Sequence, residues 1–170
     1  MAEQTHIDDL IDFSSDVINK LINSKEVVGL IVDKNDPDLF GEDGENARDH
    51  MFDYDYIDET VLQAGAYIMV DVDMTEASSG SINDLEIYVQ IVVSKKYMNL
   101  DPKKFAGIKG NRRDNLARQV DLLLNGSRDF GVGRLQLASA RTASVPQAFT
   151  SKMLVYRIPD FSKKRGFGEW

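Results

Sequence analysis

The chain contains no cysteine and only two histidines, His6 and His50, among its 170 residues. Without cysteine it forms neither disulfides nor thiolate metal sites. Neither histidine has a partner at metal-ligand spacing, so we expect no catalytic or metal-binding role for them. No apolar run approaches the roughly 20 residues of a membrane-spanning helix, and the N-terminus is acidic where a secretory signal is basic. These absences predict a soluble intracellular protein that binds no cofactor and no membrane.

Motifs of enzymes are also missing. The sequence has no G-x-S-x-G element, and Gly126, Gly131 and Gly133 precede no helical pattern, so we expect no phosphate-binding loop. The acidic stretch after residue 32 begins like an EF-hand loop, but Pro37 replaces its third ligand and Asp38 stands where the essential glycine belongs. We therefore predict neither a calcium site nor an enzyme.

The chain carries opposite charge in its two parts. Residues 1–94 hold 22 acidic and 4 basic side chains, whereas residues 95–170 hold 6 acidic and 16 basic ones. The two parts carry −18 and +10, which together give the net charge of −8. Such a division indicates a surface that binds the opposite sign, either within the fold or on another copy of the chain.

The strongest structural signal lies between Gln63 and Lys96. Two runs there alternate strictly between faces and are rich in β-branched residues, which predicts two antiparallel strands joined by a polar segment around Gly80. A hairpin cannot bury a face alone and needs a cover from elsewhere in the chain. The face that we expect to be buried carries Ala66, Ile68, Val70, Val72, Met74, Leu85, Ile87, Val89, Ile91 and Val93.

The opposite face of this hairpin mixes apolar and acidic side chains. We expect its apolar centre to be partly exposed in a monomer, which makes it a candidate contact with another protein. Paired carboxylates at Asp71 and Asp73 also suit a metal-dependent hydrolase, but the second strand lacks an acid-x-lysine pair, and we favour the interpretation that they keep an exposed face soluble. The apolar centre consists of Tyr67, Met69, Tyr88 and Val92, and Asp71, Asp73 and Glu86 edge it.

Two helical patterns supply a cover for the hairpin. The first spans residues 5–24, and its apolar spacing predicts a buried stripe. The second begins at an Asn111 cap and ends at Gly126. Between them, Ser24–Val32 fits either a short helix or a strand, and we favour the helix. The stripe of the first helix comprises Ile7, Leu10, Ile11, Ile18, Leu21 and Ile22, which Phe13 and Val17 widen to one side.

Two further strands complete the expected fold. One begins at Leu135, and the other spans Phe149–Ile158, where Pro159 ends it. The sequence therefore predicts an α+β, two-layer domain with a mainly antiparallel four-stranded sheet covered on one face by two amphipathic helices.

A long acidic loop interrupts this order. Residues 33–59 hold 11 acidic side chains against Lys34 and Arg48 and show no periodicity. We expect the aromatic residues Phe52, Tyr54 and Tyr56 to hold the end of this loop against the body of the domain.

A basic cluster precedes and begins the second long helix. Lys103, Lys104 and Lys109 lead to Arg112 and Arg113, which lie in the first helical turn, where cations oppose the helix dipole. An acidic protein partner would compensate them. A solvated loop and nucleic-acid binding are the alternatives, and the acidic net charge argues against nucleic acid as the main partner.

Four stretches carry a resemblance to a known family. They are KEVVGLIVDKNDPDL (Lys25–Leu39), DYDYIDE (Asp53–Glu59) with the strand AYIMVDVDM after it, IYVQIVVSKKYMNL (Ile87–Leu100) and NLARQVDLLLNGSRDFGVGRLQL (Asn115–Leu137). In spacing and residue type, over nearly the whole chain, they resemble the tail-completion or tail-terminator (neck) proteins of tailed bacteriophages of Gram-positive hosts. The acidic GEDGENARD at residues 41–49 departs from the proline-rich loop of that family.

The resemblance implies a structural virion protein, assembled in the host cytoplasm, with one α+β domain over residues 1–160 and a basic, aromatic arm over residues 161–170. Proteins of this kind form a hexameric ring that caps the tail tube, ends its elongation and offers a surface for head–tail joining. DNA passes through the lumen without specific binding, which an acidic wall favours. A neck adaptor between portal and tail is the alternative. The implied partners are other copies of the chain, the tail tube protein and neck or connector proteins.

In a closed ring each interface joins two different patches. We expect the basic cluster, the outer hairpin face and the arm to make contacts, and the acidic loop to face the lumen or the connector. The expected interface residues are Lys103, Lys104, Lys109, Arg112, Arg113, Tyr67, Met69, Tyr88, Phe161 and Trp170, and the expected lumen- or connector-facing residues are Asp36, Asp38, Glu42, Asp43, Glu45 and Asp49.

Overall fold

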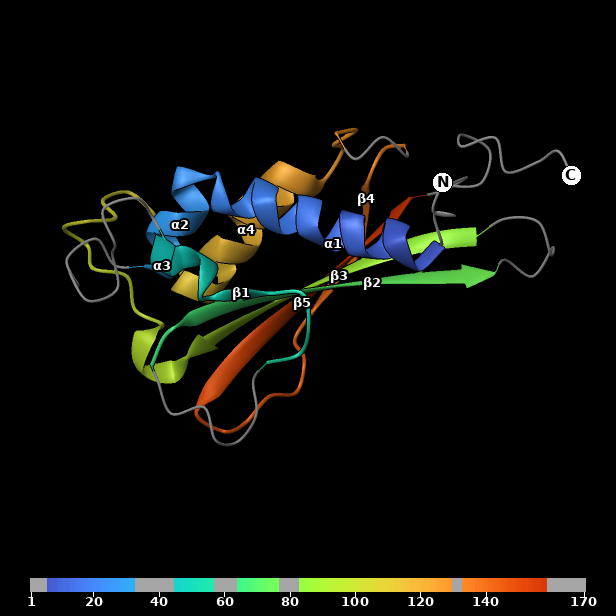
Figure 1. The fold of residues 1–170 in the computed structure, drawn as a ribbon. Helices are drawn as coiled ribbons and strands as arrows, with labels where there is room; N and C mark the ends of the chain where they lie inside the picture. Colours follow the sequence, from blue (N-terminus) through green and yellow to red (C-terminus); the bar gives the residue numbers. More distant parts are fainter. Residues whose placement is uncertain (1–5, 33–44, 57–63, 77–82, 130–132, 159–170) are drawn as a thin grey trace, which may run out of the picture.

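The fold has two layers, helices on one side and a single sheet on the other. The computed structural model describes residues 6–32, 45–56, 64–76, 83–129 and 133–158. In these ranges α1, α2 and α4 lie on one face of the sheet, and the opposite face carries no helix (Figure 1). The predicted α+β class is confirmed. The elements are α1 (His6–Ile22), α2 (Lys25–Ile31), α3 (Glu45–Arg48), β1 (Met51–Phe52), β2 (Ala66–Glu76), β3 (Asn83–Ser94), the 3₁₀ turn η1 (Lys95–Tyr97), α4 (Arg112–Leu124), β4 (Gln136–Arg141) and β5 (Phe149–Ile158).

The β2–β3 hairpin forms the centre of the sheet, as predicted. The two strands pair antiparallel from Ala66 opposite Val93 to Glu76 opposite Asn83. All ten residues expected on its buried face are buried except Met74, which is half-buried against the same core. Burial of an aliphatic side chain contributes about 1.5–3 kcal/mol, so this face is the main hydrophobic contribution of the sheet.

The other strands extend the sheet in the order β1-β2-β3-β5-β4. β5 has the predicted bounds and pairs antiparallel with both β3 and β4. The strand expected from Leu135 is β4, and Leu135 itself is buried just before it. The pairing of β4 shifts between Leu137 and Ser139, an irregularity of the kind that twists and protects an edge strand.

The sheet has one strand more than the four expected. β1 pairs parallel with β2, with Met51 opposite Ile68, so the sheet is mixed. β1 and α3 both lie inside the stretch that we expected to be one long loop, and that expectation is wrong for residues 45–48 and 51–52. A two-residue strand and a four-residue helix are too short to show periodicity, which explains why the sequence did not reveal them.

The buried side of α1 differs from the expected stripe. Phe13, Val17 and Leu21 are its most buried residues, whereas Ile7 and Ile11 are 62% and 55% exposed. α1 contacts β2, α2 and α4, and its buried residues are those that face these elements. The predicted apolar stripe of α1 is therefore wrong at Ile7 and Ile11, and the buried side is centred on Phe13, Val17 and Leu21.

The helix ends follow the sequence closely. α2 is a helix, as favoured, because the Ser24 Oγ accepts a hydrogen bond from the Val27 backbone N at 3.3 Å and caps its first turn. The Asn111 Oδ1 accepts from the Asp114 backbone N at 2.9 Å and caps α4. Gly126, with a φ of 80°, turns the chain after α4, and its N–H donates to the Leu135 carbonyl at 2.8 Å, which leads directly into β4.

None of the described helices is long and apolar enough to cross a membrane.

Candidate interaction surfaces

Arg112, expected at an interface, lies inside the protein. Its side chain is 2% exposed. Its Nε donates to the Tyr97 carbonyl at 2.8 Å and its Nη1 to the Leu30 carbonyl at 2.6 Å. The guanidinium carbon lies 3.8 Å from the centre of the Tyr97 ring and 5.7 Å from that of Phe105. Arg112 therefore joins α2, η1 and α4.

The surroundings of Arg112 explain how its charge is tolerated. As the first residue of α4 it opposes that helix's dipole, but the Leu30 carbonyl belongs to the last turn of α2, where free carbonyls attract cations. Among the described residues, two backbone carbonyls and two aromatic rings compensate this charge. Arg112 is thus not available to a partner, contrary to its expected role.

Arg113 is half-buried, and its charge is matched within the chain. Its Nη1 donates to the Thr150 hydroxyl at 2.6 Å, and its Nη2 lies 3.0 Å from the Asp114 carboxylate, which also pairs with Lys152 at 2.9 Å. Burial alone would raise the pKa of Asp114, but hydrogen bonds from Lys152, Asn111 and Arg113 outweigh it and lower that pKa. Arg113 therefore ties α4 to β5 rather than offering a free cation.

The three lysines of the basic cluster are exposed on a structured loop, residues 101–110, hereafter the basic loop. The Asp101 carbonyl accepts from the backbone N of Lys104 at 3.1 Å and of Phe105 at 2.9 Å, which closes a turn. The Phe105 ring lies next to the Arg112 guanidinium, and the apolar side chain of Ile108 is 42% exposed. Lys103, Lys104 and Lys109 project from this support, which lies beside α2 at the end of the molecule where β3 ends (Figure 1).

The apolar centre on the helix-free face is covered within the chain itself. Tyr67 and Met69 are 4% and 5% exposed, so the expectation that they form exposed apolar surface in a monomer is wrong. They pack with Val92 and Phe149, and the half-buried Phe52 lies against this cluster. Tyr56 stacks on Phe52 with ring centres 4.1 Å apart, and its ring centre lies 6.5 Å from that of Tyr67. The prediction that these aromatic residues hold the segment against the body is therefore confirmed for Phe52 and Tyr56, whereas Tyr54 is 54% exposed.

His50 belongs to the same covered region. The imidazole is buried, its ring stacks on Tyr67 at 4.9 Å, and its Nδ1 lies 3.0 Å from the Ala66 carbonyl. Burial lowers the pKa of His50 below its ordinary value of 6.5, and the hydrogen bond to Ala66 offsets only part of this. His50 thus fixes the junction between β1 and β2 as a neutral side chain.

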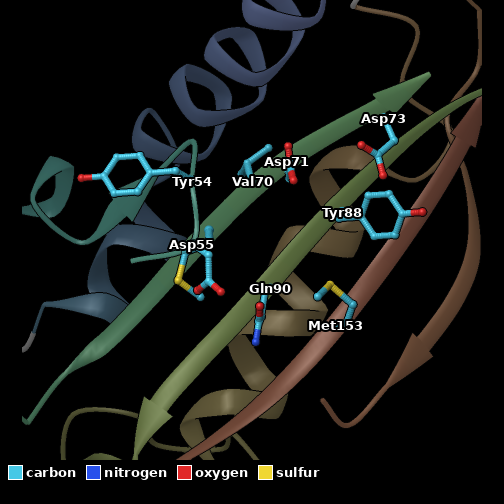
Figure 2. A pocket seen from close by; sticks show the side chains of 9 residues that line it. Tyr54, Asp55, Val70, Asp71, Asp73, Tyr88, Gln90 and Met153 are labelled. Atoms are coloured by element: carbon cyan, nitrogen blue, oxygen red, sulfur yellow. The ribbon is translucent and has the colours of Figure 1, made fainter. Parts of the chain in front are cut away.

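The other half of the helix-free face is open and forms a hollow of about 240 Å³ (Figure 2). Asp71 and Asp73 project from β2 on the same side as Tyr88, and Met153 of β5 and Tyr54 of the segment after β1 lie at its margins. The Asp71 Oδ1 accepts from the Val72 backbone N at 2.9 Å. The lining residues are Tyr54, Asp55, Met69, Val70, Asp71, Asp73, Tyr88, Gln90 and Met153.

Tyr88, a predicted contact residue, is half-buried beside this hollow and bonded to a carboxylate. Its hydroxyl donates to Glu86, which Arg157 also contacts. The Tyr88 hydrogen bond, assisted by the Arg157 guanidinium, lowers the pKa of Glu86, and the same bond raises the pKa of Tyr88 to about 12. The negative charge of Glu86 is therefore paired with Arg157 within the chain. The ion pairs of the described residues include neither Asp71 nor Asp73.

Asp71 and Asp73 share a face, as the hydrolase alternative requires. Within the described ranges, however, no three histidine, aspartate or glutamate side chains are grouped so that they could hold a metal ion. Glu86, the third carboxylate expected nearby, is engaged by Tyr88 and Arg157.

Only two of the remaining expected contact residues, Glu45 and Asp49, lie in the ranges that the structure describes. Asp49 is exposed just after α3, and Glu45 is the first residue of α3. The other expected residues of the acidic loop and the arm, namely Asp36, Asp38, Glu42, Asp43, Phe161 and Trp170, lie outside the described residues.

Comparison with known proteins identifies a family and a similar chain among the solved structures. The model of the YomW family matches residues 15–158 of the chain. No curated protein matches it. A chain from the structure described as "Virion of native gene transfer agent (GTA) particle" is 16% identical, with a TM-score of 0.48, and the match covers 85% of this chain and 91% of that chain.

Proposed function

This chain belongs to the YomW family, and we propose that it is a structural protein of a tailed-phage virion. More specifically, we propose a tail terminator, several copies of which form a ring that caps the tail tube. The proposal rests first on the four stretches that resemble tail-terminator proteins. They begin and end within the range that the family model matches.

The observation that best supports a ring is the exposure of the lysines on the basic loop. Its lysines are exposed on a support held by the buried Arg112 and by the Asp101 turn. A basic surface presented by a chain with a net charge of −8 will bind an acidic surface, and another copy of the chain offers one. Contact between two different patches is heterologous and closes into a ring when the rotation between copies allows it.

Such a ring would perform a mechanical and not a chemical task. Seated on the end of the tail tube, it would stop further tube subunits from adding and offer its other side to neck or connector proteins. DNA would cross the lumen during ejection, and acidic residues lining that lumen would not retain a polyanion, because no counterions are released on contact.

Capping of tail tubes tests this function directly. Purified protein is added to tail tube protein of the same phage during polymerisation, and tubes are examined by negative-stain electron microscopy. We expect ring-shaped particles alone and, with tubes, shorter tubes that bear a ring at one end. Rings that bind a portal complex and leave tube length unchanged would identify a neck adaptor. A chain that forms no ring and binds no tube would overturn the proposal.

A further inference from the structure

The open half of the helix-free sheet face lacks a partner in the part of the chain that the structure describes. Tyr88 and Met153, both half-buried, line its hollow. Three exposed carboxylates, those of Asp55, Asp71 and Asp73, line the same hollow and take part in no ion pair among the described residues. An apolar centre with a charged margin is the composition of a protein interface.

The basic loop has the complementary chemistry. Ile108 is an exposed apolar side chain on a loop whose exposed charges are lysines, including Lys103 and Lys109. The turn at Asp101 and the packing of Phe105 against Arg112 fix the loop before any partner binds. A fixed loop loses little conformational entropy on docking, so its contacts contribute more of their energy to affinity.

One copy of the chain cannot bring these two surfaces together. The basic loop follows η1 and lies beside α2, on the side of the sheet that the helices cover (Figure 1). Asp71 and Asp73 alternate along β2 with the core residues Val70 and Val72, so they project from the opposite face (Figure 2). The loop of one molecule can therefore meet only the hollow of another.

We propose that this hollow is the acceptor site for the basic loop of a second copy of the chain. Ile108 of the loop lies over Tyr88 and Met153, and Lys103 and Lys109 pair with the carboxylates at the margin. The inference rests on the proposed ring and specifies its interface. Each copy uses its loop on one side and its hollow on the other, which is a heterologous, head-to-tail contact.

Charge reversal on each surface tests the contact. The hollow variant carries Asp71→Lys and Asp73→Lys, and the loop variant carries Lys103→Glu and Lys109→Glu. Both pairs are exposed, so we expect normal far-UV circular dichroism and thermal unfolding. In sedimentation velocity at low salt, each variant should self-associate at least tenfold more weakly than the wild type, and Ile108→Ser should also weaken association.

Three further samples make the result specific. A chain with all four reversals should associate again, because the charges are complementary once more. A mixture of the hollow and loop variants should also associate again, with the two variants in alternation, because the native loop of one meets the native hollow of the other and the reversed loop meets the reversed hollow. The control variant Lys25→Glu with Arg118→Glu makes the same change in net charge as the loop variant at other exposed positions and should associate like the wild type.

The outcomes separate this interface from the function. If the wild type forms rings that cap tubes and both reversal variants do so equally well, the interface is refuted and the proposed function stands. If deletion of residues 159–170 abolishes association while the loop variant retains it, the occupant of the hollow is the C-terminal segment and the proposal is wrong. A wild type that remains monomeric at every concentration refutes the interface, and if it also binds no tubes the proposed function falls with it.

Discussion

Replacing Arg112 of α4 with alanine removes a cation that bonds to η1 and α2. Its contacts with the described residues give the expected loss in free energy of unfolding. Two hydrogen bonds from a charged donor, at 2.8 and 2.6 Å, each contribute about 1.5–3 kcal/mol. The contact with the Tyr97 ring adds about 0.5–2 kcal/mol. Two effects oppose this loss. Removing a cation from the start of α4 stabilises the fold by about 0.3–1 kcal/mol, and a chain without the guanidinium no longer has to desolvate it. We expect a net destabilisation of about 4 kcal/mol.

Urea unfolding followed by far-UV circular dichroism measures this loss. The midpoint should fall with little change in the slope m, because the same surface is exposed on unfolding. For a chain of this length the expected loss corresponds to a decrease in Tm of about 8–16 °C. Arg112→Lys should fall between the wild type and the alanine variant, since a lysine keeps the charge but cannot donate to two carbonyls in the geometry of the guanidinium.

Arg118→Ala is the matched control, because Arg118 lies on the same helix and is exposed. We expect that variant to unfold within about 0.5 kcal/mol of the wild type. If Arg112→Ala were no less stable than Arg118→Ala, the buried guanidinium would not hold α2, η1 and α4 together, and the reasoning would be refuted. If Arg112→Lys matched the wild type, the charge alone would matter and the two directional hydrogen bonds would not.

Three smaller perturbations test other parts of the fold. The lowered pKa of His50 means that the unfolded chain binds a proton more readily, so stability is full above pH of about 6.5 and falls as the pH decreases; urea unfolding at pH 7 and 5.5 should show this decrease in the wild type and in His6→Gln but not in His50→Gln. Tyr156→Phe removes a buried hydroxyl that donates to Asp121 at 3.1 Å and should cost about 1–2 kcal/mol in the same assay, and no loss would contradict the hydrogen bond. Ser24→Ala removes the cap of α2 and should cost about 1 kcal/mol, whereas Ser24→Asn should restore most of it.

Local patterns predicted the centre of the fold well. The alternation in β2 and β3 and the caps at Ser24 and Asn111 depend on neighbouring residues, so the sequence alone reveals them. The buried side of α1 was less well predicted, because Ile7 and Ile11 are as apolar as Phe13 and only the tertiary cover decides between them. β1 was missed since two residues show no period.

The candidate surfaces were predicted in part. Asp71 and Asp73 do share the helix-free face, and the lysines of the basic loop are exposed. Nothing in the sequence distinguished Arg112 from those lysines, because its burial depends on the carbonyl of Leu30, which lies 82 residues away in the chain. The cover over Tyr67 likewise comes from Phe52 and Tyr56, which the sequence placed against the body without indicating which residues they cover.

The position of Arg112 links the core to the proposed interface. Its guanidinium packs against Phe105, so the same buried cation that joins α2 to α4 also supports the basic loop. A substitution at Arg112 would weaken folding and loosen the loop together, and a loss of association in that variant would not separate the two effects. Lys103 and Lys109 are exposed on the outer side of this support. Reversing their charge changes what the loop binds while leaving Arg112 in place, which is why these two lysines and not the arginine decide whether copies of the chain meet through this loop.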